Sequence, residues 1–426
     1  MKRSLSVSGA SFLALCSSFL FIGLCTAPAA EEPFRPEAGK FPPSEKAYNY
    51  RGELVFVDYA NRRGSLRVQA TGNFFRNPPH PFTMLPYGIV RYHGAPADLR
   101  DIPLGTIMNI RAFLPPDPKL STVPVLPVAN KDNTTGFRPP GMEPAENHAL
   151  LLEDEPSYCL REGKVWRLKE VDLQKNQGLI TASLESKEGE QGKGVEQKMT
   201  IDPATRFWRG KECLGLEDLI AEGILPATGK KALDGQPVLL ALNWQPTPDG
   251  VFLRYHISDI WLDETAMQRA SHNQTELHKT FIRSRWMPAW IDSVEYAKFG
   301  RATVTATLFG GMDPALYADF KKGSPAFINA AENTLKHVGG SYGPAHMASK
   351  GTILDVTTTA GEAPLGSSGI QIRFETDLII EGIRPTRVVR IRPTEWPAVQ
   401  IPRQEYLGDG HEERFPTPAI FQKYGG

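Results

Sequence analysis

The feature that most constrains the fold of this chain is a short sequence phrase that occurs three times. In each copy an alternating apolar run ends on an acid, a polar stretch of four or five residues follows, and the alternation resumes after a Gly. Alternation with a period of two is typical of half-buried strands, and an acid and a Gly around a polar stretch are typical of a hairpin, with the Gly supplying a positive φ. The three copies are Val57-Asp58 to Gly64, Val171-Asp172 to Gly178, and Val294-Glu295 to Gly300.

A second phrase follows each copy of the first. An Asp and an apolar residue precede a Gly by a few positions, which predicts a single helical turn or a tight turn that leads into a strand. We expect that strand at once in the first and third copies, over residues 106–113 and 324–330, and delayed by an insertion to 238–242 in the second. The copies are Asp101-Ile102 to Gly105, Asp218-Leu219 to Gly223, and Asp319-Phe320 to Gly323.

The two phrases together outline one small barrel of five or six strands in each repeat. The predicted fold is therefore all-β: three tandem small β-barrels of the SH3- or OB-like kind, with a Pro-rich connector and one connecting helix. The predicted divisions are a signal peptide (1–30), an N-terminal linker (31–47), a first barrel (48–114), a Pro-rich connector (115–147), a second barrel (148–262), a connecting helix (263–285), a third barrel (286–397) and a tail (398–426).

Two segments between the barrels have distinct patterns. Residues 115–144 hold eight prolines, which excludes a helix or a central strand. Over 263–285 Asp263 can cap a helix whose apolar stripe holds Met267, Ala270, Leu277 and Phe281.

The first thirty residues have the pattern of an export signal. Lys2 and Arg3 precede an apolar run over 11–25, and small residues over 26–30 offer a cleavage site near Ala29-Ala30. We therefore expect an exported protein in the periplasm, or outside the cell and at its surface. No later stretch is as long as the roughly 20 apolar residues of a membrane helix, so we expect no transmembrane segment in the mature chain.

The four cysteines fall in two groups. Leu precedes both Cys16 and Cys25, whereas a lipid-attachment site has a small residue there, so simple cleavage is favoured over a lipid anchor. Cys159 and Cys213 remain in the mature chain and are candidates for a disulfide in an oxidising compartment. The alternative is two separate buried thiols.

The charge of the mature chain is close to neutral. Removal of the two basic residues of the signal from the 48 Lys and Arg leaves 46 cations against 48 acids. Proteins that bind nucleic acid need a surplus of cations to displace counterions, so we expect no nucleic-acid partner.

A resemblance can be stated on the repeated residues. The order G-x-L-x-x-V-D, turn, G-x-L-x-V, then D-apolar-x-x-G before a strand, resembles the small β-barrel repeats of uncharacterised exported bacterial proteins. It covers most of residues 48–397, and the third copy departs from it with Glu295 and a shorter gap between the phrases. The resemblance implies a fold and supplies no catalytic residues.

The strongest candidate binding residues are cationic and aromatic. If residues 386–392 form a strand, Arg390 and Arg392 share one face of it. Arginine and tryptophan together suit acidic glycans or an acidic protein surface, through charge-assisted hydrogen bonds and stacking. The alternative is an edge strand that its charges protect from pairing. The other members of this candidate set are Arg283, Arg285, Trp286 and Trp396.

Three other patterns point to specific chemistry only weakly. Gly339–Gly343 matches G-x-S-x-G around Ser341, but the stretch from Pro344 to Gly351 that follows it is too short for the helix of a nucleophile elbow. His272, Glu276 and His278 do not converge on one helix face, because His278 lies six residues after His272. The triplet 153–155 (Glu-Asp-Glu) is either a Ca²⁺ site or an exposed turn after a strand. We expect no metal, no cofactor and no catalytic residue.

The expected function is that of an exported, non-enzymatic binding or scaffold protein of the bacterial cell envelope that engages protein or glycan partners. The alternative is a hydrolase of the glycoside-hydrolase kind, with carboxylates such as Asp58, Asp172 or Glu153 in a cleft between barrels. OB-type binding of single-stranded nucleic acid is a minor third possibility, which export and neutral charge disfavour.

Overall fold

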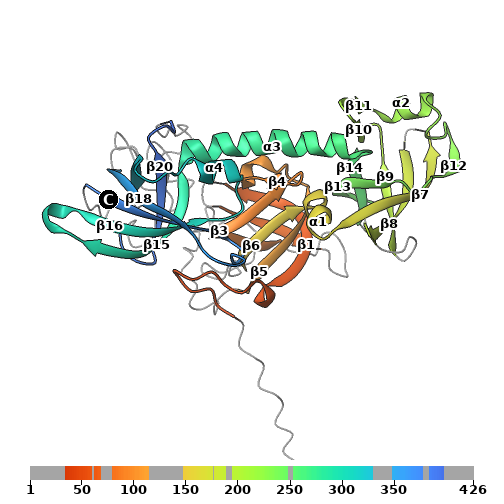
Figure 1. Cartoon of the computed structure of the whole chain (residues 1–426). Coiled ribbons are helices and arrows are strands. Elements are labelled where there is room, and N and C mark those ends of the chain that lie inside the picture. The colour runs from red at the N-terminus through yellow and green to blue at the C-terminus, as the bar shows by residue number, and fades with distance from the viewer. Residues whose placement is uncertain are drawn as a thin grey trace, which may run out of the picture. The chain divides into compact units, whose positions relative to one another are not determined.

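Three closed β-barrels make up the computed structural model of this chain (Figure 1). The structure describes residues 34–59, 62–68, 79–114, 147–175, 177–188, 194–247, 253–329, 348–377 and 383–397. In these ranges no helix combines the length and the apolar character that crossing a membrane requires. The predicted all-β fold of tandem small barrels is confirmed.

The first barrel closes because β3 pairs with both β2 and β6. Its ring runs β2–β1–β5–β6–β3, and the short β4 extends β3 outward. Its strands are β1 (Tyr48–Asp58), β2 (Arg63–Val68), β3 (His80–Tyr92), β4 (Ala95–Pro96), β5 (Ile107–Phe113) and β6 (Asn147–Asp154).

The strand β6 corrects the predicted boundary between the first two barrels. It follows the Pro-rich segment, so we assigned it to the second barrel, yet it lies between β5 and β3 of the first. The first barrel therefore extends to Asp154, and residues 115–146, which lie outside the described residues, are an insertion between two neighbouring strands.

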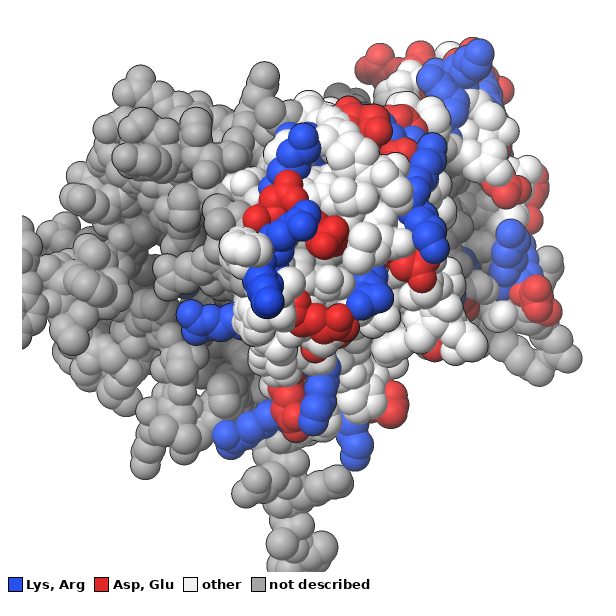
Figure 2. Space-filling view, turned by 60° about the vertical axis from the view of Figure 1, so that its left-hand side comes forward, with Lys and Arg blue, Asp and Glu red and all other residues white. Residues whose placement is uncertain are grey.

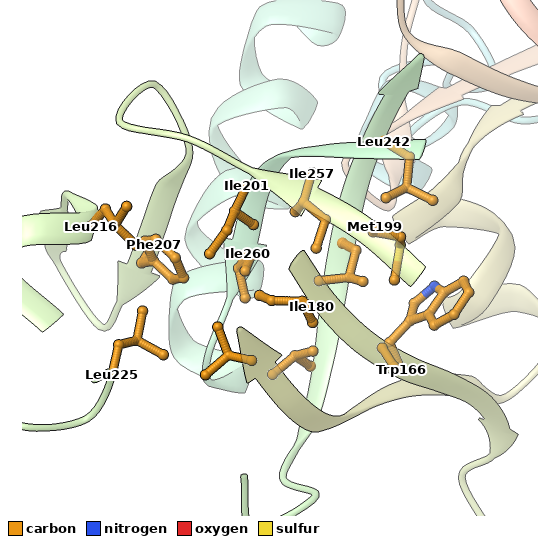
Figure 3. Packing of buried hydrophobic residues seen from close by; sticks show 14 of the residues in the cluster. Trp166, Ile180, Met199, Ile201, Phe207, Leu216, Leu225, Leu242, Ile257 and Ile260 are labelled. Atoms are coloured by element: carbon orange, nitrogen blue, oxygen red, sulfur yellow. The ribbon is translucent and has the colours of Figure 1, made fainter. Parts of the chain in front are cut away.

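The second barrel closes through a parallel pair of strands, β9 and β14. Buried aliphatic side chains from its strands and from α2 meet Phe207 and Trp166 in its interior (Figure 3). Its elements are α1 (Glu155–Arg161), β7 (Lys164–Gln174), β8 (Gln177–Ser186), β9 (Val195–Ile201), β10 (Arg206–Arg209), β11 (Glu212–Leu214), α2 (Leu216–Ala221), β12 (Gly229–Ala232), β13 (Pro237–Pro246) and β14 (Leu253–Trp261).

The third barrel is a ring of six antiparallel strands in the order β15–β16–β19–β18–β17–β20. Its interior is filled by aliphatic residues together with Phe374. Its elements are β15 (Met287–Tyr296), β16 (Ala302–Phe309), α4 (Pro314–Ala318), β17 (Pro325–Asn329), β18 (Ser349–Thr358), β19 (Ser367–Thr376) and β20 (Val388–Pro393).

The first repeated phrase forms the same hairpin in each barrel, namely β1–β2, β7–β8 and β15–β16. The likeness extends to a β-bulge that the sequence did not reveal. In each hairpin the pairing skips one residue, which is Val55, Lys169 or Asp292, and this residue stands three positions before the acid of the phrase. A bulge increases local twist and bends the strand, which helps a small sheet to close.

The glycines of the hairpins act differently from the prediction in two of the three copies. Gly300 has a positive φ of 72°, but the left-handed positions of the other two hairpins are held by Arg62 (φ 51°) and Lys175 (φ 56°). Gly64 is needed for space, since a Cβ there would lie 2.5 Å from the carbonyl oxygen of Phe56 and 2.9 Å from the ring of Phe82.

The second repeated phrase forms a short helical segment that ends in a left-handed Gly, as predicted. The segments are η3 (Leu99–Asp101), α2 and α4, and Gly105, Gly223 and Gly323 follow them with φ of 93°, 73° and 81°. The next strand is β5 in the first copy and β17 in the third. In the second copy β12 intervenes before β13, so the predicted insertion is confirmed.

The helix α3 (Glu264–Arg285) confirms the predicted connecting helix, and Asp263 caps it by accepting a hydrogen bond of 2.8 Å from the amide of Ala266. The predicted apolar stripe is wrong at Leu277, which is 64% exposed. The buried face also carries the polar residues Gln274 and His278, and Gln274 donates a hydrogen bond of 3.0 Å to Asp101 of the first barrel. Polar partners on that barrel therefore decide which face of α3 is buried.

Candidate functional site

A small cavity of about 80 Å³ gathers the arginines that are of most interest. We call it the arginine cavity. Its wall comes from the loop before β2, from β3, from the C-terminal half of α3 and from the third barrel. Its described lining includes the basic or acidic residues Arg62, Asp98, His278, Arg285 and Arg390.

Each of the three arginines reaches the cavity from a defined position in the backbone. Arg62 turns into the cavity from its left-handed position, and its guanidinium donates hydrogen bonds of 2.8 Å to the carbonyl oxygens of Pro86 and Gly88. Arg285 is the last residue of α3 and is 3% exposed. Arg390 lies in β20 and donates a hydrogen bond of 3.1 Å to the carbonyl oxygen of Trp286, where the chain leaves the helix.

The arginines repel one another in a poorly solvated place. The pKa of Arg390 is lowered to about 10, mainly by burial and also by the charges of Arg62 and Arg285, against the opposing effect of Asp98. Burial also lowers the pKa of Arg62 and raises that of Asp98, and each of these two charges counteracts the shift of the other. Among the described residues the lining therefore places three guanidinium groups next to one carboxyl group.

The remaining wall of the cavity is largely apolar. His278 adds no charge at neutral pH, because burial lowers its pKa to about 4. Tyr59 and Pro86 are exposed and mark the outer part of the cavity. The apolar lining residues include Ile89, Val90, Phe281, Ile282, Pro288, Phe309 and Met312.

Two of the six predicted binding residues, Arg285 and Arg390, line this cavity. Three others pack together beside β20 of the third barrel. Arg392 lies over the rings of Trp286 and Phe327, at 5.0 and 4.4 Å from their centroids, and donates a hydrogen bond of 2.8 Å to the carbonyl oxygen of Trp396. The strand β20 is paired on both sides, with β15 and β17, so the alternative of a protected edge strand is wrong.

The sixth residue, Arg283, stabilises the end of α3. It lies 3.1 Å from the carboxylate of Asp319, which also accepts a hydrogen bond of 2.9 Å from the indole of Trp396. Arg283 is therefore an ion-pair partner within the fold and does not line the cavity.

Sequence reasoning missed Arg62 and Asp98. Both belong to the first barrel, more than 180 residues before α3 ends, and no local pattern relates them to the other arginines. The one available signal is that no arginine stands at the corresponding place in the other two repeats.

The predicted disulfide between Cys159 and Cys213 is wrong, because the structure has both as free cysteines. Cys159 is buried in α1, where its Sγ lies 3.8 Å from Glu155, and burial raises the pKa of its thiol. Cys213 is exposed on β11. The alternative of two buried thiols therefore holds for Cys159 alone.

The acidic triplet is neither an exposed turn nor a cation site. All three side chains are buried, and each has partners in the protein. Glu153 pairs with Arg161, and Asp154 accepts hydrogen bonds from the amides of His93 and Ser157. Within the part of the chain that the structure describes, no three His, Cys, Asp or Glu side chains are grouped so that they could hold a metal.

The carboxylates of the hydrolase alternative do not form a pair. Asp58 lies 3.1 Å from Arg63 within its own hairpin, and Glu153 is held by Arg161. Asp172 belongs to the second barrel, in β7. Glu276 pairs with Lys279 on α3, and Ser341 lies outside the described residues.

The structure does bring together one arrangement with the residue types of a catalytic triad. The hydroxyl of Thr200 is 3.1 Å from Nδ1 of His256, and Nε2 of the same ring is 3.8 Å from Asp202. His256 is 4% exposed, and Thr200 is its partner on the neighbouring strand. A substrate cannot reach this imidazole, so the contact is a structural bond across two strands.

No family model matches the chain, and comparison with curated proteins and with solved structures also gave no match. The function must therefore be inferred from the site itself.

Proposed function

We propose that this is an exported, non-enzymatic binding or scaffold protein of the bacterial cell envelope, and that it engages a partner through an acidic group bound in the arginine cavity. The observation that carries the proposal is the convergence of Arg62, Arg285 and Arg390 on one cavity in whose lining Asp98 is the one acidic residue among those that the structure describes. Like charges that lower the pKa of one another in a desolvated place are relieved by a bound anion.

The chemistry of the cavity favours binding over catalysis. An arginine stays charged at neutral pH and offers a planar fork of donors to a carboxylate or sulfate, but it is a poor proton donor or acceptor. The one imidazole in the lining is held neutral and 5% exposed. Two of the carboxylates that a hydrolase would use, Asp58 and Glu153, are paired with arginines elsewhere.

The distribution of charge on the protein surface supports binding of a charged partner in the cavity. Basic and acidic side chains alternate over the face seen in Figure 2, without a broad basic area. This face as a whole therefore attracts a charged partner only weakly, which also weighs against a nucleic-acid partner there. The basic and apolar start of the chain supports export.

Calorimetric titration with a panel of acidic probes tests the proposal. The panel contains heparin, alginate, and short acetylated peptides with a free C-terminus. We expect at least one probe to bind, and to bind about tenfold more weakly to the double variant Arg62→Met, Arg390→Met, since charge-assisted hydrogen bonds are the strong ones. The control Arg373→Met removes an arginine that pairs with Glu295 on an exposed strand, and it should bind like the unaltered protein. Binding that is equal in all three proteins would contradict the proposal.

A further inference from the structure

The arginine cavity also constrains the chemical class of its ligand, and this inference rests on the proposed function. We infer that the cavity takes a carboxylate carried on a short apolar group, and that its source is the C-terminal end of a polypeptide chain with an apolar last residue. A free apolar carboxylic acid has the same chemistry, and the experiment below separates the two sources.

The size of the cavity favours a single end group. Its volume is about 80 Å³, which is much smaller than that of two other hollows on the protein. The groove between α3 and the second barrel has about 750 Å³, and a polar depression on β1, β5 and α1 has about 420 Å³. A space of this size holds a few water molecules or one small group, whereas ligand sites for larger molecules are several times larger. A chain of linked acidic sugars cannot enter it.

The donors of the cavity suit a carboxylate. A guanidinium has five N–H donors, and a carboxylate can accept two of them in parallel. Arg390 donates a hydrogen bond to the carbonyl oxygen of Trp286 through one terminal nitrogen of its guanidinium. Its Nε is buried and has no hydrogen-bond partner among the described residues. Because Arg62 is anchored on backbone carbonyls, its guanidinium is ordered before any ligand arrives.

Two more polar atoms in the lining remain unpaired. Within the described part of the chain, the hydroxyl of Tyr87 and Nδ1 of His278 are buried and have no hydrogen-bond partner. Buried polar groups nearly always have a partner in folded proteins, and a polar ligand group in the cavity can supply one to these atoms.

The apolar lining of the cavity favours the C-terminal residue of a peptide over an acidic sugar as the ligand. Phe281, Pro288, Phe309 and Met312 surround the arginines, together with the aliphatic side chains of β3. The hydroxyls of a sugar ring would be buried against these residues without hydrogen-bond partners, which is unfavourable. An apolar last side chain next to a carboxylate matches both parts of the lining. Capture of a C-terminal carboxylate is a known mode of peptide recognition.

Calorimetry on the purified full chain tests this inference with a matched pair of probes. Acetyl-Ala-Ala-Leu with a free carboxylate should bind at least about tenfold more tightly than the same peptide with a C-terminal amide, because the amide removes the charge and leaves the size unchanged. The acid should also bind about tenfold more weakly to Arg390→Met, while Arg373→Met should leave the affinity unchanged. If Arg390→Met does not fold, the comparison of acid and amide on the unaltered protein still decides.

Each other outcome has a distinct meaning. Equal binding of acid and amide would overturn the inference. Binding of 4-methylpentanoate without binding of the peptide would overturn the polypeptide source and assign a free acid. If heparin or alginate binds in a way that depends on Arg62 and Arg390 while the peptide does not, the inference fails and the proposed function stands. If no probe depends on these arginines, both fail.

Discussion

At the scale of single residues, the positions that repeat and those that do not repeat have different roles. The acids of the hairpins recur because they belong to the barrel, and two of them pair with an arginine of the same sheet, Asp58 with Arg63 and Glu295 with Arg373. Arg62 has no arginine counterpart in the other hairpins. Its left-handed conformation is shared by Lys175 and therefore belongs to the turn, whereas its guanidinium donates hydrogen bonds to the carbonyl oxygens of Pro86 and Gly88 and lines the cavity. In a repeat protein, the residue that departs from the repeat is therefore the better candidate for a site.

The buried carboxylate of Glu155 leads to the first prediction. It lies 2.8 Å from Arg51 and accepts a hydrogen bond of 3.0 Å from the indole of Trp166. The change Glu155→Ala should lower the free energy of unfolding by about 3 kcal/mol, since it leaves a charge and a buried donor without their partner. This loss is at the low end of the range for a broken buried ion pair, because Arg51 is 28% exposed and can be partly hydrated. Urea denaturation measures the effect. The exposed Glu276→Ala is the control, and a similar loss in both variants would contradict the prediction.

The two free thiols should differ in reactivity. Cys159 is buried and its thiolate is disfavoured by burial, whereas Cys213 is exposed on β11. Alkylation of the native protein followed by peptide mass spectrometry should therefore label Cys213, and it should label Cys159 only after denaturation without a reductant. A disulfide-linked pair of peptides that contain these residues would show that the free thiols are not the native state.

At the scale of elements, the sequence predicts those helices, turns and hairpins whose structure depends on residues close together in the chain. The hairpins, the helical turns before left-handed glycines and the start of α3 at Asp263 follow from turn and cap chemistry within about ten residues. The place of β6 could not be predicted in this way, because its parallel partner β3 lies far back in the chain and a Pro-rich segment precedes it. Propensity does not encode such long-range pairing.

Only the part of the candidate site that has a local sequence pattern could be predicted. Arg285 and Arg390 belong to a cluster of arginine and tryptophan that is visible in the sequence of the third barrel. Arg62 and Asp98 reach the cavity only because the first barrel packs against α3, and contacts such as that of Gln274 with Asp101 set this packing. The apolar stripe of α3 was misjudged for the same reason, since polar side chains with partners were counted as exposed.

The buried imidazole on α3 leads to a prediction about pH. Burial lowers the pKa of His278 to about 4 from an ordinary value of 6.5, with smaller effects of Asp101, Arg100, Arg62 and Asp313. Between these two pH values the unfolded chain binds a proton that the folded chain excludes. Stability is therefore full above about pH 6.5 and falls as the pH drops toward 4, by up to about 3 kcal/mol from this group.

The variant His278→Leu should reduce that loss. Urea denaturation at pH 7 and at pH 4.5 measures it, as the difference in unfolding free energy between the two conditions. His272→Leu, at an exposed position of the same helix, serves as the matched control. If both variants lose as much stability on acidification as the unaltered protein, burial of the imidazole is not the cause of the acid sensitivity.

At the scale of the whole molecule, the first and third barrels share both the arginine cavity and an aromatic cluster. Tyr87 of β3 packs against Trp290 and Phe309 of the third barrel, with ring centroids 5.8 and 6.0 Å apart. Phe41, from the segment before β1, lies 5.1 Å from Tyr87. A ligand in the cavity therefore contacts two barrels and α3 at once, and its binding should favour the arrangement in which they are packed together.

Closure of the first barrel leads to the last prediction. The strand β6 fills the position between β3 and β5 and contributes Ala149 and Leu152 to the interior. A fragment of residues 34–163 retains this strand, whereas a fragment of residues 34–146 has two unpaired strand edges in place of a closed ring. We expect cooperative thermal unfolding, followed by circular dichroism, from the longer fragment alone, because an open edge exposes backbone donors and acceptors and promotes aggregation. A cooperative transition in the shorter fragment would show that β6 is dispensable, and it would restore the predicted boundary at residue 147.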